Sequence, residues 1–401
     1  MKIAIIGAGA SGLFAGGILS QRHEVTIFDK NEKCGKKLYI TGKGRCNLTN
    51  NCSQEQFLSN TVNGNKFMFS SIHQLSPQNI IDFFEQLGLK TKTERGGRVF
   101  PISDKSSDVI KILQKFGGKC QIKLNEEVLD FCFVVSENLF KILTSKAVYY
   151  FDRVIVATGG QTYSSTGSSG DGYKFAKAFG HKIMPIKPAL VPIELGDKFI
   201  KQLQGVTLKN VSLNAIADGK KLSFFGEMLF TNRGISGPIA LTMSSFINRA
   251  ENIELAIDFK PALTKEILEK RVLKDIQNTS NKTMANFVSL YLPRSVGEVL
   301  LQRLKIDSHQ KVNEFTSNER KDFIALIKNF TLNFKRLYPL ESGIVTSGGV
   351  ELDQINPKTM ESKLQKGLYF IGEVLAVDCL TGGYNLTSAF ATAYSCAVNL
   401  N

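Results

Sequence analysis

The chain has 401 residues, of which 43% are hydrophobic and 21% are charged, and its net charge is +14 at pH 7. A chain of this length exceeds one small core, so we expect two or three domains. No apolar run approaches the roughly 20 residues that a membrane span requires, and the first apolar stretch is broken at once by glycines. These features predict a cytoplasmic protein without a membrane partner.

The cysteine and histidine patterns exclude several classes of site. The seven cysteines include no Cys-x-x-Cys pair, and the four histidines lack metal-ligand spacing. We therefore expect no metal site and no disulfide framework. The positive charge suits an anionic partner, which could be nucleic acid, an anionic membrane surface or a phosphate-bearing cofactor. Because the lysines are spread along the chain and no usual RNA-binding motif occurs, the sequence favours a generally basic surface over a nucleic-acid partner.

The first 29 residues predict a β-α-β unit. Residues 2–6 form a buried strand that runs into Gly7-Ala8-Gly9-Ala10-Ser11-Gly12, a helix follows to about residue 20, and a second strand covers 24–28. In this setting Gly7 permits the tight turn, Gly9 lets the backbone approach a pyrophosphate, and Gly12 allows close packing of helix on strand.

The same unit predicts a bound dinucleotide. The N–H groups at the start of the helix, including those of Ala10 and Ser11, attract phosphate. Asp29 ends the second strand, where its carboxylate can accept the ribose hydroxyls and disfavours NADP.

Beyond residue 30 the sequence predicts a loop followed by alternating helices and strands. Residues 31–53 are expected to be a functional loop, and helices are expected at 77–87, 106–116 and within 262–328. Strands are expected within 119–156, in an antiparallel region at 189–230, and at 368–371, before a final helix at 384–398.

Three segments favour FAD over NAD. A buried strand ends in Thr158-Gly159, and the strand at 368–371 runs into Gly372-Glu373. Gly382 and Gly383 open the last helix, whose N-terminus can stabilise a reduced flavin. A plain NAD dehydrogenase would not need this return of the C-terminus to the first domain.

The expected architecture is an α/β fold with a Rossmann-type FAD-binding domain and an inserted β domain that carries a small helical insertion. The domain boundaries are placed at 1–188 with 343–401 for FAD binding, 189–260 with 318–342 for the β insert, and 261–317 for the helical insert.

Several motifs resemble one known family. They are Gly35-Lys36-Lys37, the segment 41–50 around Gly44-Arg45-Cys46-Asn47, Gly-Arg-Val-Phe-Pro at 97–101, the segment 229–238, Thr-Ser-Gly-Gly-Val at 346–350, and the segment 356–363. Together they resemble a bacterial flavoprotein family that includes aminoacetone oxidases and a 3-dehydro-bile-acid reductase. The resemblance extends over nearly the whole chain.

The resemblance implies that the inserted β domain is an antiparallel barrel. It also implies FAD contacts beyond those of the glycine-rich turn and Asp29. The implied contacts come from Lys30, Lys36, Lys37, Gly44, Arg45, Cys46, Asn47, the backbone of Val128, Gly372, Glu373, Gly382, Gly383, Tyr384, Asn385 and Leu386. Two positions depart from the family pattern: Asn232 stands where His is common, and Ala376 stands where an acid is common.

Four residues are candidates for chemistry. Arg45 is placed near the isoalloxazine or an anionic substrate group, with a salt-bridged loop anchor as the alternative. Cys46 can contact the flavin or serve as a small buried hydrophobe, and Tyr163 can donate a proton. Arg233 precedes a Gly-Ile-Ser-Gly-Pro turn, where a structural role is the alternative.

We therefore predict an FAD-dependent oxidoreductase that acts on a small organic substrate by hydride transfer. No second Gly-x-Gly-x-x-Gly occurs, so either NAD(P)H is a transient donor or O₂ is the acceptor. The alternatives are an FAD-dependent RNA-modifying enzyme and a non-catalytic flavin-binding redox sensor. The substrate and the oligomeric state stay open.

Overall fold

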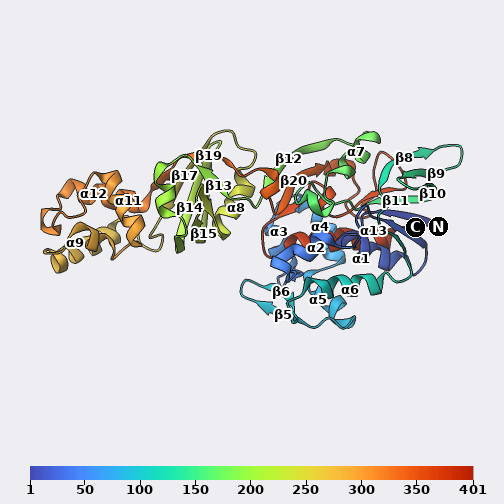
Figure 1. Cartoon of the computed structure of the whole chain (residues 1–401), viewed down its shortest axis with the longest axis horizontal. Helices are drawn as coiled ribbons and strands as arrows, with labels where there is room; N and C mark the ends of the chain where they lie inside the picture. The colour runs from blue at the N-terminus through green and yellow to red at the C-terminus, as the bar shows by residue number, and fades with distance from the viewer. Residues whose placement is uncertain (401) are drawn as a thin grey trace. The chain divides into compact units, whose positions relative to one another are not determined.

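The computed structural model describes residues 1–400 and divides the chain into two compact units. The first unit is made of Met1–Ala189 and the segment that begins at Leu340. The second unit is Leu190–Pro339, which is inserted between these two segments. The first unit therefore contains both ends of the described chain (Figure 1).

The first unit is built on a five-stranded parallel sheet with the order β21-β11-β1-β2-β7. Its strands are β1 (Lys2–Ile6), β2 (Glu24–Phe28), β7 (Gln121–Lys123), β11 (Arg153–Val156) and β21 (Leu368–Phe370). The central strands are apolar runs that are buried on both faces, as parallel sheets require. Helix α1 (Ala10–Leu19) packs against α13 (Tyr384–Asn399) and α6 (Ser106–Phe116), so the N- and C-terminal segments share one core.

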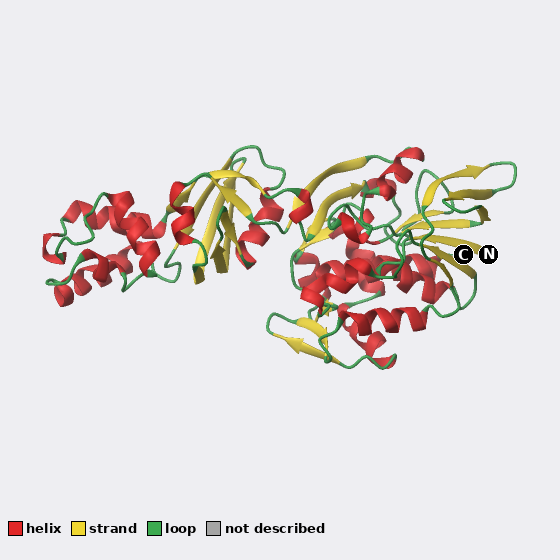
Figure 2. Cartoon of the chain, in the orientation of Figure 1, coloured by secondary structure: helices red, strands yellow, loops and turns green. Residues whose placement is uncertain are grey.

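Smaller elements surround this sheet. An antiparallel sheet has the order β10-β9-β8, and three further sheets are β3-β6-β5, β12-β20 and β22-β4. Strands are drawn in yellow and helices in red in Figure 2. Their strands are β3 (Thr49–Asn50), β4 (Thr61–Asn63), β5 (Thr91–Glu94), β6 (Arg98–Pro101), β8 (Val128–Val134), β9 (Leu139–Thr144), β10 (Val148–Phe151), β12 (Ile183–Ala189), β20 (Val345–Val350) and β22 (Asp378–Cys379). The other α-helices of this unit are α2 (Lys36–Ile40), α3 (Gln54–Ser59), α4 (Asn65–Gln74), α5 (Pro77–Gln86) and α7 (Asp171–Ala178).

The inserted unit combines a seven-stranded sheet with a group of helices. The strands are β13 (Ile193–Leu195), β14 (Thr207–Ala217), β15 (Lys220–Phe230), β16 (Gly234–Ser236), β17 (Ile253–Asp258), β18 (Phe330–Leu332) and β19 (Phe334–Leu337). The helices are α8 (Pro238–Ile247), α9 (Lys265–Thr279), α10 (Met284–Val288), α11 (Arg294–Leu304) and α12 (Ser317–Lys328). One core of buried aliphatic and phenylalanine side chains runs through both parts of this unit.

The expected antiparallel barrel is not confirmed. The sheet of the inserted unit is antiparallel with the order β18-β17-β14-β15-β16-β13-β19, so its two edges are β18 and β19. These strands follow one another in the chain, and no ladder between them closes the sheet within residues 1–400. The division of the insertion into separate β and helical domains stays a prediction.

Two local expectations are refined by the structure. The segment 31–53 is more ordered than a loop, because it contains α2, the 3-10 turn at Thr41–Gly44 and strand β3. The final helix begins at Tyr384 as expected and extends to Asn399. Among residues 1–400, no helix combines the length and the apolar character needed to cross a membrane.

Candidate functional site

The glycine-rich turn between β1 and α1 forms an open cradle. A Cβ on Gly7, whose φ is +112°, would lie 2.5 Å from the Ala157 oxygen, and a Cβ on Gly12 would lie 2.0 Å from the Gly7 oxygen. A Cβ on Gly9, in contrast, would meet no atom within 4 Å. Packing therefore accounts for Gly7 and Gly12, whereas Gly9 borders open space. Gly9 is also the N-cap of α1 and no side chain caps that helix, so its first N–H groups suit an anion.

Asp29 ties the end of β2 to this turn. Its Oδ2 accepts a hydrogen bond of 2.8 Å from the Ala8 N–H, and its Oδ1 accepts 2.8 Å bonds from the backbone and the side chain of Asn31. A carboxylate offers about four acceptor positions, so Asp29 keeps capacity for a ligand hydroxyl. The Glu126 N–H binds the Asp29 carbonyl, which places the start of β8 at Val128 close by.

Two lysines that were predicted to contact the cofactor are engaged by protein carboxylates. Lys30 pairs with Asp171 and also donates to Ser169. Lys36 lies 3.4 Å from the Glu32 carboxylate in an exposed pair. Lys30 thus braces the end of β2 against the start of α7.

Lys37 and Glu373 link the two ends of the chain in the first unit. The Lys37 Nζ lies 2.6 Å from Glu373 Oε2 and donates a 2.9 Å hydrogen bond to the Thr162 hydroxyl. Glu373 Oε1 accepts a 3.0 Å bond from the Thr346 N–H. Both members of the ion pair are largely buried, with 23% and 21% of their side chains exposed. The predicted cofactor residues Lys37 and Glu373 are therefore brought together by the fold.

Arg45 is held by two carboxylates of the β5–β6 region. Its guanidinium pairs with Glu94 and with Asp104, the latter at 2.7 Å, and lies 4.1 Å from the centre of the Phe100 ring. Hydrogen bonds from Arg45 lower the pKa of Glu94, and those from Lys92 and Arg45 lower the pKa of Asp104. This geometry matches the anchoring alternative, in which Arg45 fixes the segment 41–47.

Cys46 and Asn47 directly follow Arg45 in the chain. Cys46 is fully buried, and burial raises the pKa of its thiol to about 12, so the thiol stays neutral at pH 7. Its burial favours the alternative of a small hydrophobe over that of a nucleophile. The Asn47 Oδ1 is buried and has no hydrogen-bond partner among residues 1–400. Gly44 borders open space, because a Cβ there would meet no atom within 4 Å.

The segment after β11 supplies a second buried polar atom without a partner. The Thr158 hydroxyl has no hydrogen bond within the described residues, and Gly159 follows with a φ of +74°. Tyr163 has a φ of +55° and precedes the 3-10 turn at Ser164–Thr166, and its ring centre lies 6.0 Å from the Lys37 Nζ. Buried orphan groups of this kind fit a polar ligand that the chain alone does not provide.

Two glycines near the C-terminus pack closely against residues of the N-terminal segment. A Cβ on Gly372 would lie 2.7 Å from the Ser11 hydroxyl, and a Cβ on Gly383 would lie 2.3 Å from the Thr49 oxygen. Gly383 is the N-cap of α13, and no side chain caps this helix. Tyr384 and Leu386, in its first turn, are partly buried against the core. The N-terminus of α13 therefore offers a second set of N–H groups to an anionic or carbonyl oxygen.

Asn385 fixes the turn before α13. Its Oδ1 accepts from the Cys379 N–H at 2.9 Å, and its Nδ2 donates to the carbonyls of Cys379 and Leu380. The side chain thereby closes the loop that contains Gly382. All of these hydrogen bonds are to backbone groups, so Asn385 holds the backbone of that loop in place.

Arg233 lies in the inserted unit, unlike Arg45, Cys46 and Tyr163. Its Nη2 binds both carboxylate oxygens of Glu194 at 3.1 and 3.2 Å. Asn232 and Ala376, the two departures from the family pattern, are exposed and fully buried, respectively.

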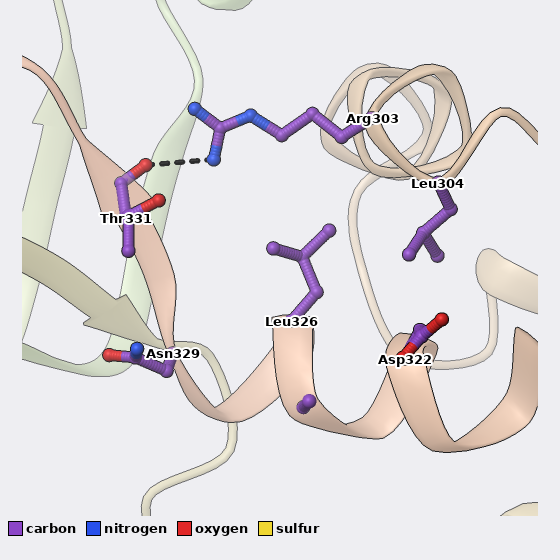
Figure 3. Close-up of a pocket in the computed structure, with 7 residues that line it drawn as sticks. Arg303, Leu304, Asp322, Leu326, Asn329 and Thr331 are labelled. Atoms are coloured by element: carbon purple, nitrogen blue, oxygen red, sulfur yellow. Dashed lines mark hydrogen bonds between the residues drawn. The ribbon is translucent and has the colours of Figure 1, made fainter. Parts of the chain in front are cut away.

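A pocket of the inserted unit is lined by Arg303, Leu304, Asp322, Ala325, Leu326, Asn329 and Thr331 (Figure 3). Arg303 donates a 2.8 Å hydrogen bond to the Thr331 carbonyl and a 3.1 Å bond to Asp197. Its guanidinium also lies 4.1 Å from the centre of the Phe330 ring. These contacts join α11 to the sheet, so Arg303 is a structural link, and none of the predicted cofactor residues lines this pocket.

Several residues that organise the site were not predicted from the sequence. Asn31 forms a tight turn on Asp29, a motif that the pairing of Asp and Asn two residues apart could have indicated. Glu94 and Asp104 pair with Arg45, and Asp171 pairs with Lys30. Because these partners are distant in the chain, no local sequence pattern predicts the pairs. Asp378 is fully buried and accepts a 2.6 Å hydrogen bond from the Asn63 side chain, and no motif at this position predicted such a role.

The comparisons with known proteins agree with this geometry. Residues 1–399 match the model of the HI0933-like protein Rossmann domain. The chain belongs to this family. Among its relatives, a 3-dehydro-bile acid delta(4,6)-reductase of Clostridium scindens is 31% identical over 404 residues, covering 98% of this chain and 97% of the relative.

Two further relatives carry a different name. They are ribosomal RNA dihydrouridine synthases of Haemophilus influenzae and Escherichia coli, with 30% and 28% identity. Each match covers 99% of this chain, and 98% and 97% of the respective relatives.

Solved structures share the fold at low identity. The 3-ketosteroid-delta4-(5alpha)-dehydrogenase of Rhodococcus jostii has a TM-score of 0.53 at 12% identity and covers 99% of this chain and 95% of that one. The quinol fumarate reductase FrdA of E. coli has a TM-score of 0.51 at 16% identity. This match covers 99% of this chain and 69% of that one. The family and the named reductase identify the protein as an FAD-dependent oxidoreductase.

Proposed function

We propose that the protein is an FAD-dependent reductase that adds hydrogen across a carbon–carbon double bond conjugated to a carbonyl group in a small organic substrate. The observation that carries this proposal is the match, over nearly the full length of both chains, with a delta(4,6)-reductase. That name denotes reduction of carbon–carbon double bonds. NAD(P)H is the proposed transient donor, because electrons must enter before a double bond can be reduced.

The residues that would hold FAD are those around the two uncapped helix N-termini. The Gly9 cradle and the first N–H groups of α1 would bind the pyrophosphate, and Asp29 would accept the ribose hydroxyls. The start of β8 at Val128 lies beside Asp29 through the Glu126 hydrogen bond, which suits the adenine end. The buried Asn47 and Thr158 oxygens would find partners on the cofactor.

Bound FAD supplies hydride-transfer chemistry, and the chain supplies position and electrostatics. Lys37 and Glu373 hold the segment 35–44 against the C-terminal segment. Asn385 fixes the turn from which the N-terminus of α13 presents its N–H groups. The positive end of that helix stabilises negative charge that develops next to it.

The candidate catalytic residues are ranked by these contacts. Arg45 and Cys46 serve to fix the loop in this proposal, because the first is paired twice and the second is a buried neutral thiol. Tyr163 is the preferred proton donor of the first unit, since it lies in a left-handed turn beside Lys37.

The test is an anaerobic spectroscopic titration of the purified protein. An oxidised flavin spectrum should bleach on addition of NADH or NADPH and return when a conjugated enone is added, with the saturated product formed in equal amount. A flavin that neither nucleotide reduces would contradict the proposed donor. A flavin that is reduced but is reoxidised only by O₂ would contradict the proposed acceptor.

A second candidate is an RNA-reducing enzyme, and a specific observation favours it. The two relatives named ribosomal RNA dihydrouridine synthases match this chain over 99% of its length. Dihydrouridine differs from uridine by two hydrogens across a double bond that is conjugated to a carbonyl, so the same bond chemistry serves both candidates. The net charge of +14 also suits a polyanion. In the same titration, reoxidation by uridine-containing RNA but not by small enones would decide for this candidate.

A further inference from the structure

One buried carboxylate in the inserted unit is surrounded by three cations. Glu194 in β13 accepts hydrogen bonds from Arg233 Nη2 at 3.1 Å, from Lys335 Nζ at 2.9 Å and from Arg336 Nε at 2.8 Å. Strand β13 lies between β16 and β19, and Glu194 is in register with Gly234 and Arg336. Three neighbouring strands therefore fix the cluster, which we name the Glu194 cluster.

The cluster carries a surplus of positive charge at the surface. Only 7% of the Glu194 side chain is exposed, whereas 53%, 56% and 60% of the Arg233, Lys335 and Arg336 side chains are exposed. Three cations and one carboxylate leave a net charge of +2. A single cation would neutralise Glu194, so neutralisation of this carboxylate does not require the other two.

The cations also keep unused donors. A guanidinium has five N–H groups. Within residues 1–400, Arg233 commits only Nη2 and Arg336 commits only Nε to hydrogen bonds. Their remaining N–H groups can donate hydrogen bonds to a ligand. The side chains are exposed, and their bonds to Glu194 already fix their orientation. The entropy cost of ordering these side chains for a ligand is therefore reduced.

We propose that the Glu194 cluster is a binding site for a phosphate-type oxyanion. Guanidinium groups bind phosphate oxygens in a two-pronged manner, and lysine adds a point charge. The net charge of +2 matches the charge of a phosphate ligand better than that of a ligand with one carboxylate. This inference goes beyond the proposed function, because reduction of a double bond does not require a phosphate site.

The phosphate has two possible sources, namely the backbone of a nucleic acid and a free or small phosphorylated molecule. The test compares the full-length protein with the double variant Lys335→Gln/Arg336→Gln, which leaves Arg233 on Glu194. The control is Lys270→Gln/Lys274→Gln, which removes two exposed lysines of the same unit. One arm measures binding of a fluorescent single-stranded RNA by anisotropy over a salt series. The other arm measures the melting temperature as inorganic phosphate replaces chloride at constant ionic strength.

For a nucleic-acid source, the double variant should bind the RNA more weakly than wild type and control. Its slope of log affinity against log salt should fall by about 1.4, because each lost contact to a single strand contributes about 0.7. For a small-molecule source, a saturable rise in melting temperature with phosphate should disappear in the double variant only. If the double variant does not fold, Lys335→Gln alone should lower the slope by about 0.7 or reduce the phosphate effect. Equal behaviour of variant, control and wild type in both arms would overturn the proposal.

Discussion

Lys37 and Glu373 are separated by 336 positions in the chain, yet their side chains form an ion pair of 2.6 Å. The pair joins the segment after the first β-α-β unit to the segment after β21. Both side chains are mostly buried, so loss of either partner leaves the other uncompensated.

Replacing Lys37 with methionine should weaken FAD binding about tenfold, which corresponds to about 1.4 kcal/mol. It should also lower the free energy of unfolding by roughly 1.5–3 kcal/mol, because a charge-assisted hydrogen bond is lost. FAD titration of the apoprotein and urea unfolding measure these effects. Lys111→Met, which removes an exposed lysine paired with Asp108, is the control and should change neither quantity. Unchanged FAD affinity in Lys37→Met would contradict the positioning role.

Replacing Asn385 with alanine should loosen the turn before α13. The variant loses the bonds to the Cys379 N–H and to two carbonyls, so we expect a loss of roughly 1–3 kcal/mol in folding stability. We also expect slower flavin reduction, because the N-terminus of α13 is no longer held in place. Stopped-flow reduction by NAD(P)H at saturating FAD measures this rate. A rate equal to wild type would show that Asn385 has only a structural role.

Folding stability should depend on pH through Glu194. Hydrogen bonds from Arg336, Lys335 and Arg233 lower the pKa of this carboxyl from 4.5 to about 2. Its stabilisation is therefore complete above pH 4.5 and is lost as the pH falls from 4.5 to about 2. Glu194→Gln should lower the melting temperature at pH 7, and its difference from wild type should shrink over that interval. Thermal melts from pH 2 to 7 measure the difference, and a constant difference would be the contrary result.

Arg303 should stabilise the inserted unit without affecting the cofactor. Replacing it with methionine removes the hydrogen bonds to Asp197 and to the Thr331 carbonyl, so we expect a loss of roughly 1–3 kcal/mol. Arg294→Met removes a highly exposed pair and should change stability by less than about 0.5 kcal/mol. Urea unfolding and FAD content are the measurements. Loss of bound FAD in folded Arg303→Met would contradict the assignment of Arg303 as a structural link.

Much of the first unit could be predicted because its signals are local. The strand, turn and helix at the N-terminus follow from apolar runs and glycine spacing, and the roles expected of Gly7, Gly9 and Gly12 agree with the space around each residue. The C-terminal helix begins where the glycine pair predicted it.

The remaining features depend on distant partners. Nothing near Arg45 indicates that residues 94 and 104 hold it, because those carboxylates reach it only through the β5–β6 region. The family resemblance predicts that Lys30 contacts FAD, but nothing near Lys30 indicates its pairing with Asp171, which lies 141 positions away. Closure of the inserted sheet likewise depends on pairing between its edge strands, which alternation of apolar residues does not specify.

The most direct test of the account is FAD titration of apoprotein carrying Gly9→Ala. A Cβ at Gly9 meets no protein atom within 4 Å, so the apoprotein should stay within about 1 kcal/mol of wild-type stability. Its FAD affinity should fall at least about 100-fold, or about 2.7 kcal/mol, because the methyl group occupies the cradle. Gly12→Ala should instead destabilise the fold, since its Cβ would lie 2.0 Å from the Gly7 oxygen. Wild-type FAD affinity in a folded Gly9→Ala protein would contradict the placement of the cofactor at this turn.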